Sequence, residues 1–389
     1  MPRSRTASTF FRTVALACLP ACLLAGATIA QPTTNPTGTP SSLAVYTALQ
    51  DYYGELERLA TQQNAASLSV VVVRRGEPVF MAVFGSQDRT TGVPAGPNTL
   101  YHQASVSKPF VAMAVMQLVD RGLLQLDQPV SSVLPELAAT GPGASSMTVR
   151  HLLQHTAGLP DVEDYRWGAG PDDDGAGEQY LAELAGIDLA FPPGEGAAYS
   201  NIGYDLLGIM ISRVSGQTFE AYMAENVLAP AGMVTASFLR ADAESRLEAR
   251  GHVYEDGRPA PIHPYNRRHA PSSTLQASPR DMASILAQMT RPGGPSGRLV
   301  SASGLAAMWR DGSVQLDGQR VALGWFDSPF RGHRRYSHTG GDIGFASYMA
   351  VFPDDALGIA LMTNSPMAMD TQQILFTAVS GAFDLFAEQ

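Results

Sequence analysis

The sequence predicts an α+β fold, in which an antiparallel sheet is built from both ends of the chain and flanked by the first and last helices. Two observations support this prediction. Strand-like apolar runs occur early, at residues 67–73 and 78–84, and again late, after residue 335. Between them, up to about residue 280, the apolar spacing is mainly helical. We therefore expect a helical lobe, approximately residues 102–280, inserted into the sheet domain.

The N-terminal residues predict export. Arg3, Arg5 and Arg12 supply positive charge, residues 13–24 are apolar, and small residues near position 30 offer cleavage sites, so residues 1–30 are interpreted as a signal peptide. Their apolar run is too short for a spanning helix, and we expect no membrane span. The predicted location is periplasmic or secreted, with lipid anchoring at Cys22 as the alternative. Residues 31–42 are rich in Pro, Thr, Ser and Asn and predict a disordered linker.

Composition narrows the function classes for residues 43–389, which we interpret as one domain. The only cysteines, Cys18 and Cys22, lie in the signal segment, so the domain has no thiol for catalysis or metal binding. The net charge of −10 argues against nucleic acid or anionic membranes as partners. About 350 residues can form a sufficient core without disulfides. We expect a monomer that binds a small-molecule or peptide substrate.

Each element follows from local patterns. A helical spacing covers 43–62, and Arg75-Gly76-Glu77 joins two strands as a hairpin. Residues 106–122 predict a helix that tolerates Pro109 in its first turn. Later apolar periods predict helices at 148–156, 203–215 and 219–228, strands at 335–338, 345–352 and 358–363, and a final helix at 371–386.

Lys108 is the only lysine of the chain, and it stands three residues after Ser105. Arginine could supply positive charge here, but a guanidinium stays protonated, whereas a buried ammonium can lose its proton and act as a base. On a helix, the Ser-x-x-Lys spacing places both side chains on one face. The pair therefore predicts an activated serine nucleophile at a helix N-terminus. The alternative is that Ser105 only caps the helix.

Two further motifs extend this pair. Tyr199-Ser200-Asn201 follows the turn-forming Pro192-Pro193-Gly194, and His338-Thr339-Gly340-Gly341 ends a predicted strand. This motif order resembles the penicillin-recognising serine hydrolases. From about residue 43 onward the chain is most similar to the branch with class C β-lactamases, serine D-Ala-D-Ala carboxypeptidases, D-aminopeptidases and β-lactamase-like esterases. Segments 99–101, 152–160 and 231–233 share the resemblance.

The resemblance implies a role for each motif residue. Ser105 would form an acyl-enzyme and Lys108 would take its proton. Tyr199, as a phenolate, would share that duty and return the proton to the leaving group. Asn201 would bind the amide side chain of the substrate. The alternatives are a core aromatic for Tyr199 and a helix cap for Asn201.

The last motif implies the rest of the substrate site. Backbone N–H groups of Ser105 and Gly341 would form the oxyanion hole. Gly340 and Gly341 would let the substrate backbone approach the strand. Thr339 and His338 would contact a carboxylate or another polar end of the substrate, although a histidine at a strand end can also be structural.

Three departures from the family pattern affect substrate choice. Many β-lactamases have lysine at the position of His338, and its replacement weakens the expectation of β-lactam hydrolysis. Ser107 replaces a common threonine, which is a mild change. Residues 270–274 stand where relatives often have a Gly-Gly pair, so substrate choice shifts if this segment rims the cleft.

Other motifs predict neither a metal nor a cofactor. His151 and His155 are four residues apart, but the glutamate of a zinc-peptidase helix is missing between them. Residues 172–174 are three aspartates without the spacing of a calcium loop. We therefore expect an exported serine hydrolase acting through an acyl-enzyme. A D-Ala-D-Ala carboxypeptidase or D-aminopeptidase is the first choice, followed by an esterase, a class C-like β-lactamase and a non-catalytic penicillin-binding sensor.

Overall fold

The computed structural model describes residues 42–387 except 140–142, 244, 254–257, 296, 298, 311–313, 317 and 366–370. The predicted signal peptide and residues 31–41 of the predicted linker lie outside this range, and Ser42 already belongs to the first helix. Within the described ranges, no helix has the length and hydrophobicity needed to cross a bilayer.

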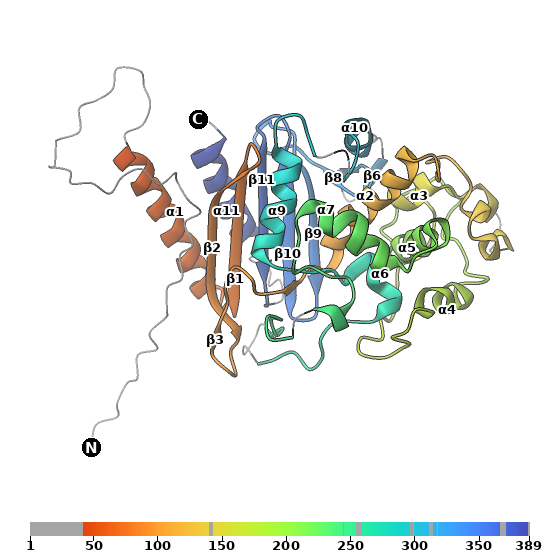
Figure 1. The fold of residues 1–389 in the computed structure, drawn as a ribbon, viewed down its shortest axis with the longest axis horizontal. Coiled ribbons are helices and arrows are strands. Elements are labelled where there is room, and N and C mark those ends of the chain that lie inside the picture. Colours follow the sequence, from red (N-terminus) through yellow and green to blue (C-terminus); the bar gives the residue numbers. More distant parts are fainter. Residues whose placement is uncertain are drawn as a thin grey trace.

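An antiparallel sheet forms the centre of the described structure (Figure 1). Its strand order is β3-β2-β1-β11-β10-β9-β8-β7-β6. Because β1 pairs with β11 from Leu68↔Thr363 to Arg74↔Leu357, the two ends of the chain share one sheet. The strands are β1 Ser67–Arg74, β2 Glu77–Asp88, β3 Val93–Pro94, β6 Val314–Leu316, β7 Gln319–Val321, β8 Phe326–Asp327, β9 Tyr336–Asp342, β10 Phe345–Phe352 and β11 Leu357–Thr363.

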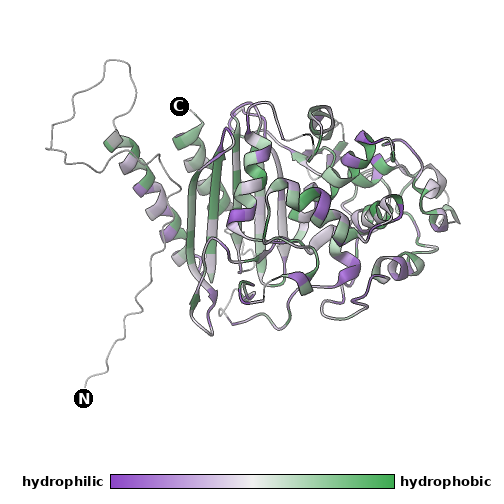
Figure 2. Cartoon of the chain, viewed as in Figure 1, coloured by the Kyte–Doolittle hydropathy of each residue, from purple (hydrophilic) through white to green (hydrophobic). Residues whose placement is uncertain are grey.

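Helices α1 (Ser42–Gln62) and α11 (Thr371–Phe386) cover one face of the sheet (Figure 1). Alternate residues of β1, such as Val70 and Val72, form a core with these helices, because side chains alternate between the two faces of a strand. Val71 and Val73 belong to the core on the other face. The central strands are therefore buried on both sides, and Figure 2 shows them as mainly hydrophobic.

The opposite face carries α9 (Pro279–Thr290) and the helical lobe. The strand pair of β4 (Tyr101–His102) and β5 (Gln276–Ala277) joins the beginning and end of that lobe. The other α-helices are α2 Ser107–Asp120, α3 Val149–Leu153, α4 Ala176–Glu183, α5 Asn201–Ser215, α6 Phe219–Met223, α7 Ala229–Ala231, α8 Ala270–Ser273 and α10 Ala302–Arg310. Shorter turns are the 3-10 segments η1 Ala104–Val106, η2 Val130–Ser132, η3 Pro135–Ala139, η4 Ala144–Ser146, η6 Arg240–Asp242 and η7 Arg267–His269, and the π turn η5 Ala224–Leu228.

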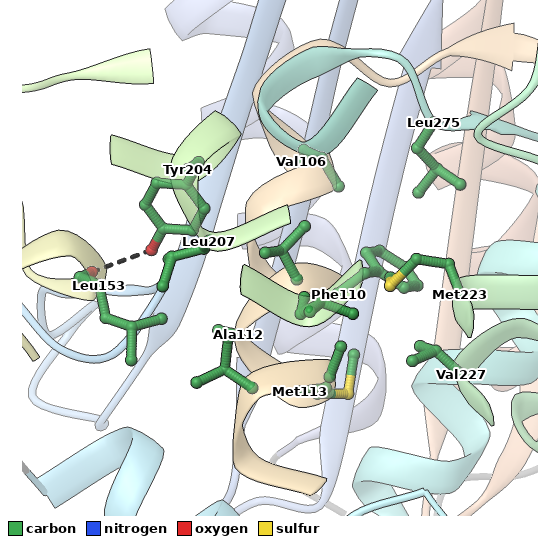
Figure 3. Packing of buried hydrophobic residues seen from close by; sticks show 14 of the residues in the cluster. Val106, Phe110, Ala112, Met113, Leu153, Tyr204, Leu207, Met223, Val227 and Leu275 are labelled. Atoms are coloured by element: carbon green, nitrogen blue, oxygen red, sulfur yellow. Dashed lines mark hydrogen bonds between the residues drawn. The ribbon is translucent and has the colours of Figure 1, made fainter. Parts of the chain in front are cut away.

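Helix α2 is the centre of the lobe, and its residues from Ser107 to Leu118 are all buried. Phe110 and Met113 pack among residues of the neighbouring helices (Figure 3). The hydroxyl of Tyr204 on α5 donates to the backbone oxygen of Leu153 at 2.9 Å. A helix that is apolar all round requires such complete coverage. This packing holds the start of α2, and with it the predicted nucleophile, in a fixed place.

The structure confirms the predicted α+β fold, with an antiparallel sheet between terminal helices and a helical lobe. Helix 371–386 and strand 345–352 match their predicted bounds. The helix predicted at 106–122 is the 3-10 turn η1 followed by α2. Sequence analysis missed strands β6, β7 and β8, because two or three residues are too few to show an alternating pattern.

Candidate active site

Ser105 lies in the tight turn η1, immediately before α2. The preceding Ala104 has a φ of 46°, a left-handed conformation that is uncommon for residues other than glycine. The turn is held against the sheet, because the Ser347 hydroxyl on β10 donates to the backbone oxygen of Gln103 at 2.6 Å. Strained backbone of this kind persists only where the surrounding contacts enforce it.

The side chain of Lys108 is fully buried beside Ser105. Its Nζ donates to Ser105 Oγ at 2.9 Å, to Asn201 Oδ1 at 2.6 Å and to the backbone oxygen of Ser272 at 2.9 Å. Burial lowers the pKa of Lys108 from 10.5 to about 7, although the negative charges of Asp205 and Asp161 oppose the shift. The amine can therefore exist in its neutral form near neutral pH and accept the proton of Ser105.

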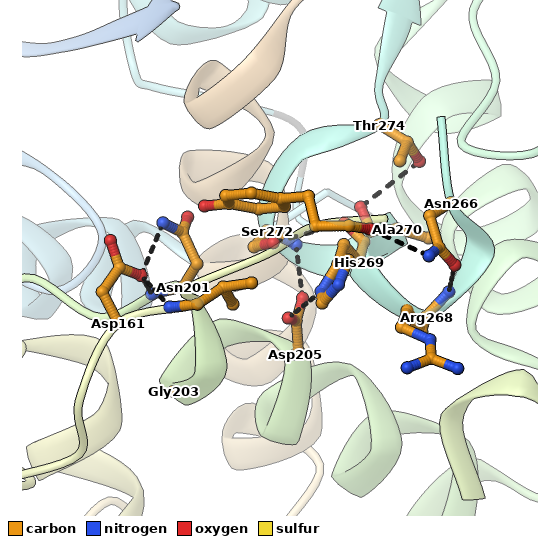
Figure 4. A network of polar contacts seen from close by, with 12 residues as sticks. Asp161, Asn201, Gly203, Asp205, Asn266, Arg268, His269, Ala270, Ser272 and Thr274 are labelled. Carbon is orange, nitrogen blue, oxygen red and sulfur yellow. Dashed lines mark hydrogen bonds and ion pairs between the residues drawn. The ribbon is translucent and has the colours of Figure 1, made fainter. Parts of the chain in front are cut away.

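Asn201 lies at the start of α5 (Figure 4). Its side chain is placed against Lys108. Its Oδ1 accepts from Lys108, and its Nδ2 donates to Asp161 Oδ1 at 2.9 Å. The backbone N–H of Asn201 also donates to Asp161 Oδ1, at 2.8 Å. Asn201 is 5% exposed. The predicted contact with a substrate amide would require breaking these bonds, so in this structure Asn201 orients the lysine. Asp161, directly after the 152–160 segment, was missed.

Asp205 and His269 form a buried pair that holds Ser272, whose backbone oxygen accepts from Lys108. Asp205 Oδ2 lies 2.8 Å from His269 Nδ1, and Asp205 Oδ1 accepts from the backbone N–H of Ser272 at 3.2 Å (Figure 4). Both side chains are almost completely buried. They hold α8, whose Ser272 carbonyl contacts the amine. The segment 270–274, which departs from the family pattern, is therefore part of the lysine site. Neither Asp205 nor His269 was predicted, because no local motif marks them.

Tyr199 lies over the same lysine, with its ring centroid 4.9 Å from Lys108 Nζ. The His155 ring packs against it, tilted by 30°, at a centroid distance of 4.3 Å, and His155 Nδ1 accepts from the backbone N–H of Ser200. Burial raises the pKa of Tyr199 above its usual value of 10, although contact with Ser105 opposes the shift. This corrects the predicted phenolate: the free protein carries a protonated phenol, which can donate to a leaving group.

The last motif lies on β9, and its residues alternate between the two faces of the strand. His338 pairs with Met349, whose side chain belongs to the core of the helical lobe. Thr339 pairs with Tyr348, whose side chain belongs to the core under α11. Gly340 faces the nucleophile turn so closely that a Cβ would lie 2.2 Å from the backbone oxygen of Gln103.

His338 is buried, at 3% exposure, and its Nδ1 donates to the backbone oxygen of Thr339 at 2.7 Å. Burial, helped by the charge of Lys108, lowers the pKa of His338 to about 3. The imidazole is therefore neutral. The predicted contact with a substrate carboxylate would lack a cation at this position, and this is the main electrostatic difference between the structure and the sequence-based expectation.

The motif residues, which span more than 230 positions of the sequence, meet in one cleft. Ser105, Tyr199, His338, Thr339 and Gly341 line a cavity of about 610 Å³. Lys108, Asn201 and Gly340 lie behind this surface and are buried. The arrangement combines a nucleophile, a buried amine of lowered pKa and a phenol, which is the set required for acyl transfer.

The pair His151 and His155 has structural roles. His151 Nδ1 accepts from the backbone N–H of Thr148 in the cap of α3, and His155 contacts Ser200 and Tyr199. In the described part of the chain, no three His, Cys, Asp or Glu side chains form a group that could hold a metal ion.

The sequence of this chain matches a known protein family over most of its length. Residues 54–379 match the Beta-lactamase family. The chain belongs to the Beta-lactamase family. The resemblance predicted from the three motifs is thereby confirmed. A solved class C beta-lactamase superposes with a TM-score of 0.74, covering 88% of this chain and 98% of its own, at 20% identity. At that identity the likeness supports the fold only.

Two curated proteins are similar to this chain in sequence. Esterase EstB of Burkholderia gladioli is 36% identical over 209 residues, which are 49% of this chain and 51% of that protein. Protein flp of Staphylococcus aureus (strain N315) is 28% identical over 301 residues, covering 76% of this chain and 59% of that protein. The matches thus span only half to three fifths of these relatives.

The lowered pKa of Lys108 predicts a pH dependence. Only the neutral amine can accept the Ser105 proton, so kcat/KM should rise about tenfold per pH unit below pH 7 and level off above it. We expect this profile for a simple ester between pH 5 and pH 9, after subtraction of the uncatalysed rate. A kcat/KM that stays constant down to pH 5 would contradict the assignment of Lys108 as the base.

A second contact ties the two sides of the cleft together. His102, three residues before Ser105, lies 2.8 Å through Nε2 from Asp342 Oδ2, one residue after Gly341. The Gln276 side-chain amide lies 3.1 Å from His102 Nδ1. Because that amide donates to Nδ1, the Nε2–H donates to Asp342. The pair therefore fixes the nucleophile turn relative to the strand that carries Gly341.

Asp342→Ala is expected to lower kcat by about 10- to 100-fold with little change in KM, because small displacements of reacting groups are costly. Asp342→Asn keeps an acceptor for His102 and should restore most of kcat. Steady-state kinetics give kcat and KM of both variants and the wild type, and thermal unfolding checks that all three are folded at the assay temperature. Equal kcat values for Asp342→Ala and wild type would show that the pair does not position the site.

Proposed function

We propose that this protein is a serine hydrolase that cleaves carboxylic esters through an acyl-enzyme. The contact of Lys108 Nζ with Ser105 Oγ at 2.9 Å, made by a buried amine whose pKa is about 7, carries the proposal. In the first step Ser105 Oγ bonds to the carbonyl carbon and its proton passes to Lys108. The bond to the alkoxy oxygen then breaks, Tyr199 supplies the proton to the alcohol, and the proton on Lys108 replaces it on Tyr199. Water then attacks the acyl carbonyl carbon, the bond to Ser105 Oγ breaks, and the carboxylic acid leaves while a proton from the water returns to Ser105.

The neutral state of His338 favours an ester over a substrate with a terminal carboxylate. Recognition of a carboxylate in a buried site normally uses a cation, but the pKa of about 3 leaves His338 uncharged, and Arg335, the other basic residue of the cavity, is bonded to Ser328. The similarity to Esterase EstB, at 36% identity over half of each chain, agrees with this choice. The esterase, second in the sequence-based order, thus becomes the preferred activity.

A D-Ala-D-Ala carboxypeptidase or D-aminopeptidase is the second candidate, and the free edge of β9 favours it. β8 pairs with β9 only at Ser337 and Tyr336. Residues 339–342 therefore have no strand partner on that side among the described residues. An extended peptide could add to such an edge through main-chain hydrogen bonds.

Export remains a proposal supported by the signal-like residues 1–30, and the monomeric state remains a prediction.

One set of measurements separates these functions. The protein and its Ser105→Ala variant are incubated with a short-chain ester and, separately, with a penicillin, and the intact mass and remaining substrate are measured. Ser105-dependent ester hydrolysis with penicillin untouched supports the esterase. A long-lived penicillin adduct on Ser105 with no ester hydrolysis favours the peptidase, and penicillin consumption indicates a β-lactamase. Inertness toward both would leave the non-catalytic sensor.

A further inference from the structure

A recess continues from the catalytic cleft past the edge of β9 toward α11. It is part of the same cavity of about 610 Å³ that Ser105 and Tyr199 line. Its far walls are mainly apolar and come from three parts of the chain: the strands β6 and β8, the segment after β8, and α11. These apolar residues are Leu316, Phe326, Phe330, Leu375, Phe376 and Val379.

Phe376 stands at the mouth of this recess with 60% of its surface exposed. Its ring lies 6.2 Å from that of Phe330, in an edge-on arrangement. Phe376 continues the apolar wall that Phe330 and Leu375 form, and a contiguous apolar surface beside a catalytic cleft is typical of a ligand-binding site. Because Ser105 and Phe376 line the same cavity, the ligand that covers this surface is part of the substrate.

The charged group of the recess is bonded within its wall. Arg335 is the one cation among its described lining residues, since His338 is neutral. Its guanidinium is held by Ser328, to whose backbone oxygen Nε donates at 3.0 Å and to whose Oγ Nη2 donates at 2.6 Å. It also lies 5.8 Å from the ring centroid of Phe330. Arg335 therefore acts as part of the wall beside that ring.

One buried hydroxyl lines the recess. Tyr348 is 5% exposed, and its hydroxyl makes no close hydrogen bond among the described residues, with Ser337 and Arg335 as the nearby polar side chains. Pockets for small molecules commonly combine apolar walls with a few such polar groups, which fix orientation. Apolar walls with one buried hydroxyl fit an uncharged apolar group that forms few hydrogen bonds.

The position of Tyr199 decides which half of the substrate lies here. Tyr199 lines the recess together with Ser105, and its protonated phenol is the group that can donate to the leaving oxygen. Asn201 accepts from Lys108 and donates to Asp161, and neither residue lines the recess. We propose that the recess binds the leaving group, and that this group is an uncharged apolar alcohol. The inference rests on the proposed ester hydrolysis and names its substrate class.

Two isomeric esters test this proposal. Hexyl acetate and methyl heptanoate have the same atoms, but the alkyl chain lies on the alcohol in the first and on the acid in the second. We expect the wild-type protein to hydrolyse hexyl acetate with at least about tenfold higher kcat/KM, because alkyl burial on the alcohol side lowers the barrier. The 6-acetoxyhexanoate anion, which adds a carboxylate to that alcohol, should react at least about tenfold more slowly than hexyl acetate.

A matched pair of variants locates the effect. Phe376→Ala should lower kcat/KM for hexyl acetate at least about threefold more than for methyl acetate. Tyr46→Ala removes an aromatic ring of similar exposure, 58%, from α1, which does not line the recess, and should leave both esters unchanged. Equal effects of Phe376→Ala on the two esters would overturn the proposal.

The remaining outcomes separate the two levels of inference. A preference for methyl heptanoate, or for the carboxylate-bearing ester, with Ser105-dependent turnover would overturn the leaving-group assignment and leave the esterase function intact. Absence of Ser105-dependent hydrolysis of every ester would overturn the proposed function and this inference together.

Discussion

Lys108→Arg is expected to lower the kcat/KM of ester hydrolysis by at least about 100-fold, the usual scale of a lost general base. Arginine keeps the positive charge and the hydrogen-bond donors, but it cannot become neutral at the pH of the reaction. Lys108 Nζ has three acceptors at 2.6–2.9 Å and no exposed surface, so the amine is both oriented and desolvated. Steady-state kinetics measure the effect.

Because the arginine side chain is larger, its folding must be checked. Lys108→Met keeps a similar length without an ionisable group and provides the second variant, and thermal unfolding reports whether each variant folds. Both should lose activity while they still unfold cooperatively. A folded Lys108→Arg variant with activity within about tenfold of wild type would contradict the base role, because a permanent cation would then be sufficient.

Gly340→Ala is expected to reduce both stability and activity, whereas Gly341→Ala should leave stability close to wild type. A Cβ at position 340 would lie 2.2 Å from the backbone oxygen of Gln103 and 2.3 Å from Ser347 Oγ, but one at position 341 would meet no atom within 4 Å. Overpacking of this kind costs about 1–3 kcal/mol. The nucleophile turn must separate from β9, which should lower kcat/KM by about 100-fold.

The two adjacent glycines are matched controls for each other, because both substitutions add one methyl group to the same strand. Thermal unfolding and kcat/KM of the two variants are compared under identical conditions. Similar melting temperatures for Gly340→Ala and Gly341→Ala would show that the turn can move away without cost, and that the close approach does not hold Ser105 in place.

The sequence predicted those parts of the fold that local patterns specify. Residues 345–352 form a strand and residues 371–386 form a helix, as their apolar spacing predicts. The two-residue strands β4 and β5 could not be predicted, because their pairing joins residues 174 positions apart or more. Such pairings depend on how the helical lobe folds back, which no local pattern contains.

The sequence by itself determined the identity of the reacting groups. Ser105 and Lys108 are neighbours on consecutive turns, so their spacing predicts their contact, and the motif order places Tyr199 and Gly341 in the same site. The tertiary structure decided their ionisation states and surroundings. Burial makes His338 neutral and keeps Tyr199 protonated. Asn201 and Ser272 accept hydrogen bonds from Lys108, and Asp161 holds Asn201 in place. The physical reason is that pKa values and pocket walls depend on desolvation and contacts between distant segments, which arise only when the chain folds.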